Sequence, residues 1–197
     1  PANSAREVLQ GWRAPPRLSL IALHVPQANI SLARNATVSA AQGEWIAFID
    51  DDETPQTDWL VQLTSAQQAH SADAVFAPVV PRYVPGTPAW IVQGQYFDRR
   101  RFPTGTRIDE RDTRTGNVLI SAALLKSMTG PFDADFGRTG GEDSLLFRDL
   151  LAKGAKFIWC DEAPVEEDVP LDRANAAWLL RRAYRIGQTW IRAEQHR

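Results

Sequence analysis

The chain has 197 residues, of which 44% are hydrophobic and 23% charged, and its formal net charge is −2. These values are typical of one ordinary globular domain with a sizeable core, and they argue against a general nucleic-acid-binding protein. The only cysteine, Cys160, excludes an intrachain disulfide and favours a reducing compartment; it follows an apolar run that predicts a buried, unreactive thiol. No apolar run is long enough to span a bilayer, and the three histidines lack zinc-site spacing.

Helix and strand signals alternate through the first eighty residues. In chain order they predict a short helix at 4–11, a strand at 17–25, a helix at 31–42 with Ser31 as its N-cap, a strand at 44–50, a helix at 57–70 and a strand at 73–80. This alternation predicts an α/β fold with a mostly parallel sheet flanked by helices.

The second half of the chain is less regular. Residues 83–114 are interrupted by prolines and glycines, which predicts a long excursion over the sheet. Six arginines lie between Arg99 and Arg114 against three acids, and a solvated surface loop is the simpler interpretation of that cluster. The later signals predict strands at 115–121, 155–161 and 163–167, and helices at 122–128, 142–153 and 171–195. No linker divides the chain, so we expect a single domain over 1–197.

An acidic cluster directly follows the strand predicted at 44–50. The run from Trp45 to Ile49 is apolar, and it ends in Asp50, Asp51, Asp52 and Glu53. Ligands of open α/β sheets bind just past the carboxyl ends of the strands, and like charges this close need a positive partner or open solvent. Carboxylate oxygens suit Mg²⁺ or Mn²⁺, so the pattern indicates a metal site, with a solvated acidic loop as the alternative.

A second candidate site lies at the start of the helix predicted at 142–153. Glu142 and Asp143 follow the glycine pair Gly140-Gly141, which lets the backbone turn sharply. A carboxylate at this position is either a capping group near the positive end of the helix dipole or an ionised general base.

Taken in order, these motifs resemble the family 2 glycosyltransferases, which have the GT-A fold. The matching stretches lie between residues 30 and 190, roughly, and are Ser31–Asn35, Gln42–Asp52, Thr57–Leu60, Thr115–Asn117 and Gly141–Asp143. The ordered combination is much more specific than any one of these stretches. Within this family, the chain resembles the bacterial transferases that take part in polysaccharide synthesis at the cell envelope.

The resemblance implies a metal-dependent, inverting transfer of a sugar from a nucleotide-diphosphate donor to a hydroxyl of a saccharide or lipid-linked acceptor. Asp143 would be the general base, and Glu142 would orient the acceptor or the base. Asp50 and Asp52 would hold Mg²⁺ or Mn²⁺ with the donor diphosphate. The nucleotide-binding group would also include Asp50, Asp51 and Arg34, although a structural salt bridge is an alternative role for Arg34. Thr115–Asn117 would border the acceptor pocket.

The last predicted helix carries a basic face. Arg181, Arg185, Gln188 and Arg192 share that face by their spacing. A solvated amphipathic helix is one interpretation. The others are that Arg181, Arg182 or Arg185 meets the donor diphosphate, or that the face contacts anionic lipid at the inner surface of the cell membrane. We otherwise expect a cytoplasmic protein that binds no nucleic acid.

The start of the chain departs from the family pattern. The first two strands of that pattern, which end in P-x-Y-N-R and D-x-S, have no counterpart here. The sequence begins at Pro1, without an initiator methionine or a signal peptide. We therefore expect an N-terminally incomplete fold that lacks ~50 residues. Residues 1–80 would keep the nucleotide and metal half, and 81–197 the acceptor half. Such a chain would be inactive alone, or would pair its exposed sheet edge with another chain.

Two alternatives to a transferase remain open from the residues. Asp50, Asp52 and Thr54 also satisfy the D-x-D-x-T motif of haloacid dehalogenase-like phosphatases, in which Asp50 would attack phosphorus. The other alternative is a non-catalytic module that binds a sugar or a nucleotide.

Overall fold

The computed structural model describes residues 9, 11, 12, 15 and 18–195, whose strands form two sheets. A four-stranded sheet has the order β1-β5-β3-β6, and a three-stranded sheet has the order β2-β7-β4. The strands are β1 (Trp45–Phe48), β2 (Glu53–Pro55), β3 (Ala74–Phe76), β4 (Val79–Tyr83), β5 (Val118–Ser121), β6 (Phe157–Trp159) and β7 (Val165–Val169).

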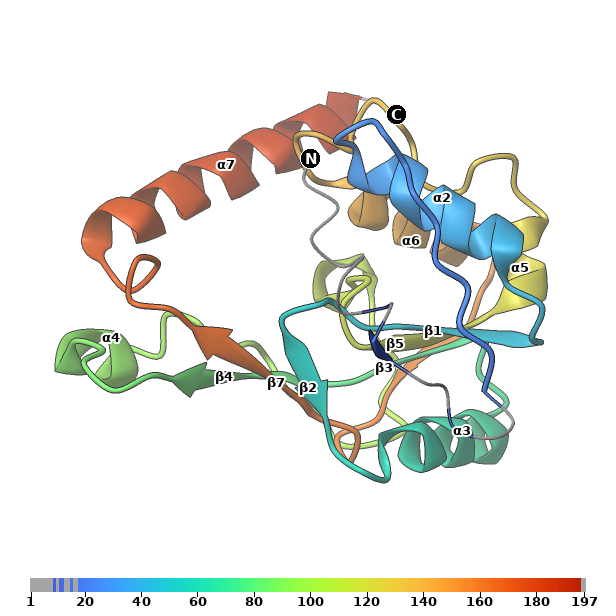
Figure 1. The fold of residues 1–197 in the computed structure, drawn as a ribbon, viewed down its shortest axis with the longest axis horizontal. Helices are drawn as coiled ribbons and strands as arrows, with labels where there is room; N and C mark the ends of the chain where they lie inside the picture. Colours follow the sequence, from blue (N-terminus) through green and yellow to red (C-terminus); the bar gives the residue numbers. More distant parts are fainter. Residues whose placement is uncertain (1–8, 10, 13–14, 16–17, 196–197) are drawn as a thin grey trace.

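Helices cover both faces of the four-stranded sheet. Figure 1 shows α2, α5 and α6 on one side of this sheet and α3 on the other. The helices are α2 (Ile30–Ala40), α3 (Trp59–His70), α4 (Ala89–Gln93), α5 (Ala122–Lys126), α6 (Glu142–Ala152) and α7 (Ala176–Gln195), with a 3₁₀ turn η1 at Glu110–Asp112.

The central strand β3 explains why both faces are covered. Ala74 and Phe76 are buried in the cluster that includes side chains of α2, α5 and α6, whereas Val75 is buried in the cluster formed with α3. Successive strand residues point to opposite faces, so a strand that is apolar throughout needs a layer on each side. The predicted α/β layering is therefore confirmed.

The predicted strand directions are only partly correct. Sheet pairing is mixed rather than mostly parallel, because β1–β5, β3–β5 and β2–β7 are antiparallel, and β3–β6 and β4–β7 are parallel. Among the described strands, β1 pairs with β5 alone, and its residues are half-buried. A short apolar run predicts burial, but it carries no information on the direction of its partner.

Two predictions near the start of the described chain are wrong. Residues 18–26 form no strand, because their alternating apolar side chains find no partner strand among the described residues and are largely exposed. The N-cap of α2 is Asn29, whose side chain accepts a hydrogen bond from the Leu32 amide at 3.1 Å. Ser31 instead donates to the Asp133 carbonyl at 2.7 Å. The helix predicted at 4–11 lies mostly outside the described residues.

The segment predicted as one strand at 73–80 contains two strands in different sheets. β3 ends at Phe76 and β4 begins at Val79, with Pro78 between them. Proline lacks an amide hydrogen, so it interrupts the ladder. The Pro78 carbonyl accepts from the Val165 amide at 3.0 Å, which starts the second sheet. The later helices and strands are confirmed with shortened ends, except that the strand predicted at 163–167 is shifted to Val165–Val169. α7 begins after a turn that follows Pro170.

Candidate active site

Arg34 connects the acidic loop to the start of α6. Its guanidinium lies 3.5 Å from Asp50 Oδ1 and donates a hydrogen bond to Glu142 Oε1 at 2.5 Å. The side chains of Arg34 and Glu142 are 12% and 6% exposed, whereas Asp50 is 47% exposed. The structure therefore brings together three predicted site residues from distant parts of the chain, and the salt bridge considered for Arg34 is present.

The acidic loop between β1 and β2 is packed closely against the start of β5. Glu53 Oε2 accepts a hydrogen bond from the Asp50 amide at 3.0 Å. A Cβ atom on Gly116 would lie 2.7 Å from Glu53 Oε1 and 3.6 Å from Asp50 Oδ2. The glycine of the predicted 115–117 motif therefore makes room for two carboxylates.

Burial dominates the electrostatics of these carboxyl groups. It raises the pKa of Asp50, with the Asp52 carboxylate adding to the effect and the Arg34 guanidinium opposing it. Burial raises the pKa of Glu53 to about 7, and the Asp50 carboxylate adds to this rise while the hydrogen bond from the Asp50 amide opposes it. The pKa of Glu142 is raised by burial and by Asp143, against the effect of Arg34. Negative charge is thus incompletely neutralised here.

The acidic loop fits a cation that is shared with a phosphate-bearing ligand. Within the described residues, no group of three or more His, Cys, Asp or Glu side chains is arranged to hold a metal by itself. Mg²⁺ commonly binds through one or two carboxylates and completes its shell with water and substrate phosphates. Asp50 and Asp52 offer such hard oxygen donors, and each side chain is 47% exposed.

Replacing Glu53 with glutamine is expected to stabilise the fold above pH 7. The unfolded carboxyl group loses its proton near 4.5 and the folded one near about 7, so wild-type stability falls as the pH rises between these values. Solvent screening of this half-exposed group limits the effect to about 1–2 kcal/mol. Urea unfolding at pH 5 and pH 8 should show that the free energy of unfolding of the variant, relative to that of the wild type, is higher at pH 8 than at pH 5. A difference that does not vary with pH would contradict the assignment.

Asp143 lies in the first turn of α6, beside a cavity of about 650 Å³. Gly140 and Gly141 have positive φ values of 84° and 103°, so the predicted sharp turn is confirmed. The cavity is also lined by Glu142, Arg185 and Trp190. Asp143 Oδ1 accepts a hydrogen bond from the Ser144 amide at 2.8 Å. A carboxylate thus borders a space large enough for a sugar.

Helix α7 closes this cavity from one side. It crosses the upper part of the molecule in Figure 1, and it is anchored at both ends. Trp178 packs on Phe97 near its start, and Ala193 packs with Phe136 near its end. A Cβ atom on Gly141 would lie only 2.5 Å from Thr189 Cγ2, so a larger residue would push α7 away from α6.

A second cavity, of about 370 Å³, lies beside the start of α7 and contains Arg99, Arg173, Arg182 and Arg185. Arg173 Nη1 lies 3.7 Å from Asp52 Oδ2, which connects this cavity to the acidic loop. Arg185 lines both cavities, whereas Arg181 is exposed and lines neither of them. Of the three arginines considered for this helix, the structure brings Arg182 and Arg185 close to the other candidates, but not Arg181.

Asn117 has an interior position rather than one in a pocket. It is 1% exposed, accepts from the Trp59 indole at 2.7 Å, and donates to the carbonyls of Pro78 and Ala163 at 2.9 and 2.7 Å. These bonds connect α3, the β3–β4 break and the segment before β7. The part of the 115–117 motif that touches the acidic loop is therefore Gly116.

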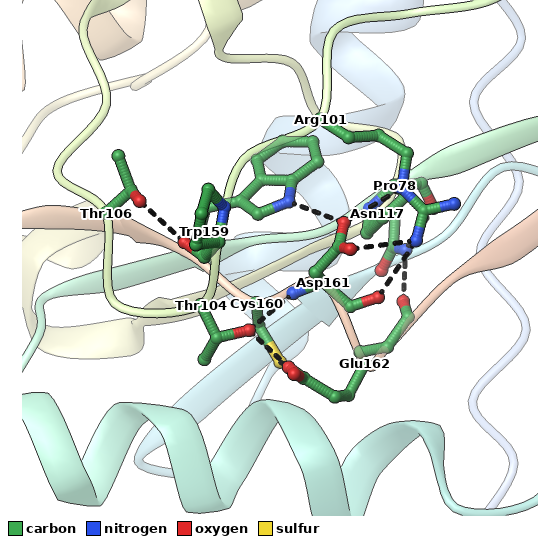
Figure 2. A network of polar contacts seen from close by, with 11 residues as sticks. Pro78, Arg101, Thr104, Thr106, Asn117, Trp159, Cys160, Asp161 and Glu162 are labelled. Carbon is green, nitrogen blue, oxygen red and sulfur yellow. Dashed lines mark hydrogen bonds and ion pairs between the residues drawn. The ribbon is translucent and has the colours of Figure 1, made fainter.

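Figure 2 shows how part of the arginine-rich excursion is held against the end of β6. Arg101 makes two hydrogen bonds to the Asp161 carboxylate, at 2.9 and 3.0 Å, and Asp161 also accepts from the Trp159 indole at 3.1 Å. The Arg101 guanidinium holds the pKa of Asp161 below its usual value. Neighbouring Cys160 is 1% exposed, and burial raises its pKa to about 11, so the predicted buried thiol is confirmed.

The sequence did not single out several residues that lie in or beside the candidate site. Arg99 and Arg114 belong to the cluster interpreted as a solvated loop, Arg173 precedes the last helix, and Glu53 was only part of the acidic run. Arg99 donates to Glu167 at 2.9 Å, and burial lowers the pKa of Arg114 to about 10. The density of arginines between 99 and 114 was the available signal.

This chain is similar to known proteins over most of its length. The model of the family described as glycosyl transferase family 2 matches residues 2–127. The succinoglycan biosynthesis protein ExoM of Rhizobium meliloti is 34% identical over 94% of this chain and 60% of its own length. The glucosyl-dolichyl phosphate glucuronosyltransferase of Haloferax volcanii is 27% identical over 83% of this chain and 56% of its own length. The chain thus spans somewhat more than half the length of these relatives.

Solved structures show the same fold at low sequence identity. Residues 1–349 of S. aureus TarS, in complex with UDP-GlcNAc, superpose with a TM-score of 0.60 at 16% identity, over 89% of this chain and 50% of that one. GalNAc-T7 with UDP, GalNAc and Mn²⁺ gives a TM-score of 0.51 at 12% identity, over 73% of this chain and 31% of that one. The expected GT-A fold is confirmed. In the described part of the chain, none of the helices combines the length and apolar character needed to cross a bilayer.

Proposed function

The chain belongs to glycosyl transferase family 2, and we propose that it forms the part of an enzyme that moves a sugar from a nucleotide-diphosphate donor to an acceptor hydroxyl. The observation that carries the proposal is the contact of Arg34 with both Asp50 and Glu142. This contact holds the acidic loop close to the start of α6, where Asp143 borders a cavity of about 650 Å³. A donor site and an acceptor site would then be neighbours.

In this proposal the acidic loop receives the donor. Asp50 and Asp52 hold a divalent cation, and Arg34 keeps Asp50 in position through its second contact with Glu142. When bound, Mg²⁺ or Mn²⁺ neutralises the charge that builds up on the departing nucleoside diphosphate. Asp51 is exposed and acts electrostatically on Asp50, and in this proposal it contacts the nucleotide. Support comes from GalNAc-T7, which was solved with UDP and Mn²⁺, and from TarS, which was solved with UDP-GlcNAc.

Asp143 acts as the general base in this proposal. Its carboxylate takes the proton of the acceptor hydroxyl, whose oxygen forms a bond to the anomeric carbon of the sugar. The bond from that carbon to the diphosphate breaks, and its electron pair leaves with the nucleoside diphosphate. Attack from the opposite side inverts the anomeric configuration. Glu142 contributes by fixing Arg34, since its side chain is buried and bonded to that guanidinium.

The acceptor is a saccharide or a lipid-linked saccharide in this proposal. ExoM is named for succinoglycan biosynthesis, and the Haloferax volcanii relative is named for a dolichyl phosphate substrate. A screen of nucleotide sugars with saccharide acceptors and Mn²⁺ tests the proposal by release of nucleoside diphosphate. Acceptor-dependent release supports transfer. Phosphate release from a simple phosphomonoester, lost in Asp50→Asn, would instead favour the phosphatase alternative.

The outer face of α7 supports peripheral contact with an anionic membrane. Leu180, Tyr184 and Ile191 follow at helical spacing and are 72%, 71% and 54% exposed. Each of these three residues is followed directly by an arginine, and the arginines flank the apolar line: they are Arg181, Arg185 and Arg192. An exposed apolar line beside positive charge is typical of a helix that lies in the interface of an acidic bilayer.

Replacing Leu180 and Ile191 with serine is expected to weaken vesicle binding by about tenfold or more, because burial of their side chains in the bilayer is lost. Co-sedimentation with phosphatidylcholine vesicles, with and without phosphatidylglycerol, measures the effect, and only the acidic vesicles should bind the wild-type chain. Val61→Ser is the matched control, since Val61 is 63% exposed on α3. Equal binding by the double variant and the wild type would contradict the membrane contact.

A further inference from the structure

The cavity beside the start of α7 carries more positive charge than its acids neutralise. Four arginines line it, against Glu167 and Asp168. Asp168 is held by the exposed Arg82 in a bidentate pair at 2.5 and 3.0 Å. Glu167 is shared, because its two carboxylate oxygens lie 2.9 Å from Arg99 and 3.7 Å from Arg173. Among the described ion pairs, none involves Arg182 or Arg185.

Arg182 is held in place by aromatic rings rather than by an acid. Its guanidinium carbon lies 5.6 Å from the ring centre of Phe97 and 5.4 Å from that of Trp178, and these two rings are stacked. Burial lowers the pKa of Arg182, and the nearby Arg99, Arg185 and Arg173 lower it further, against the opposing effect of Glu167. A guanidinium fixed in this way is already oriented for bidentate contact with an anion.

The arginine cavity connects to both parts of the proposed site. Arg173 links it to Asp52, and Arg185 lines this cavity together with the one that contains Asp143. Half-buried Arg114 interacts electrostatically with Asp143 and also with Arg99 and Arg182. An anion in the arginine cavity would therefore lie next to the ligand that occupies the cavity of Asp143.

We propose that the cavity lined by Arg99, Arg173, Arg182 and Arg185 binds an anionic group of the acceptor, either a phosphate or a carboxylate. The inference rests on the proposed function, in which the acceptor occupies the neighbouring cavity of Asp143. In that function the donor diphosphate is neutralised by the cation at Asp50 and Asp52. The four arginines are therefore available to bind a second anionic group. Phosphates and carboxylates both match the planar fork of guanidinium donors.

Calorimetry in the absence of divalent cation and nucleotide tests the proposal with three probes: inorganic pyrophosphate, glucuronate and neutral glucose. Either anion should bind the wild-type chain, and glucose should not. Tighter glucuronate binding favours an acidic sugar, and tighter pyrophosphate binding favours a phosphate group. If a nucleoside diphosphate with Mn²⁺ displaced the bound pyrophosphate, these arginines would hold the donor diphosphate, and the proposal would be overturned. Arg185→Gln changes an exposed residue and should weaken binding of the anion about tenfold or more. Arg182→Met, which keeps the packing on the rings, should have the same effect.

Arg192→Gln is the control, because Arg192 lies on the same helix and lines neither cavity. Its binding of the anion should equal that of the wild type. Metal-free anion binding does not involve the cation at Asp50 and Asp52, so a failure of the donor site is distinguishable from a failure of this one. Absence of binding by both anions, or an equal loss in Arg192→Gln, would overturn the proposal.

Discussion

Replacing Asp143 with asparagine is expected to slow sugar transfer by about 10²- to 10⁴-fold while donor binding stays unchanged. Asparagine keeps the shape of the side chain, and its oxygen still accepts the hydrogen bond that Asp143 Oδ1 receives from the Ser144 amide at 2.8 Å. It cannot take a proton from an acceptor hydroxyl. The loss should therefore appear in the rate of the chemical step, measured with the active enzyme that contains this chain.

Asp149→Asn is the matched control for this experiment. Asp149 lies on the same helix, its side chain is 55% exposed, and it lines a different cavity from Asp143. The transfer rate of this variant should equal that of the wild type. If Asp143→Asn retained transfer within about threefold of the wild-type rate, the general base would have to be a different group.

Arg34 is also the residue whose replacement is expected to have a large effect on the stability of the fold. Replacing Arg34 with methionine is expected to destabilise the fold by about 3–5 kcal/mol, because it leaves the Glu142 carboxylate buried without its partner. The side chain of Glu142 is 6% exposed, and its Oε2 atom has no hydrogen-bond partner among the described residues. The loss should be smaller at acidic pH, since burial and Asp143 raise the Glu142 pKa and protonation removes the uncompensated charge.

A double variant separates this explanation from a simple loss of packing. Arg34→Met combined with Glu142→Gln should recover most of the lost free energy of unfolding, because no buried charge remains. Chemical denaturation of the two single variants and the double variant measures the coupling. Arg82→Met is the control, because Arg82 forms an exposed ion pair with Asp168 and its loss should change stability little. A double variant as unstable as Arg34→Met would refute the buried-charge explanation.

Local chemistry in the sequence predicted the local structure around much of the candidate site. Apolar runs that end in acids, and a glycine pair before a helix, are features that a few neighbouring residues determine, so the acidic loop and the start of α6 were located correctly. Gly116 was also identified, although its physical role is to admit the carboxylates of Asp50 and Glu53. The motif at 115–117 does not reveal that Gly116 contacts the acidic loop while Asn117 forms hydrogen bonds in the interior.

The features that the sequence did not predict depend on contacts between distant segments. The direction of β1 relative to β5 is decided by the chain path, and the exposed coil at 18–26 has the same alternation as a paired strand. Arg182 and Arg181 are adjacent in sequence, yet only Arg182 reaches the rings of Phe97 and Trp178. Helical spacing identified a basic face, but the packing of α7 decides which arginines enter a cavity.

The most direct test of a donor site at the acidic loop is a Mn²⁺ titration, followed by electron paramagnetic resonance, in the presence of a nucleoside diphosphate. The wild-type chain should take up Mn²⁺, and Asp52→Asn should require at least about tenfold more metal for the same uptake. Asp58→Asn, which changes an exposed acid at the start of α3, should match the wild type. Equal uptake by Asp52→Asn and the wild-type chain would contradict a donor site at the acidic loop.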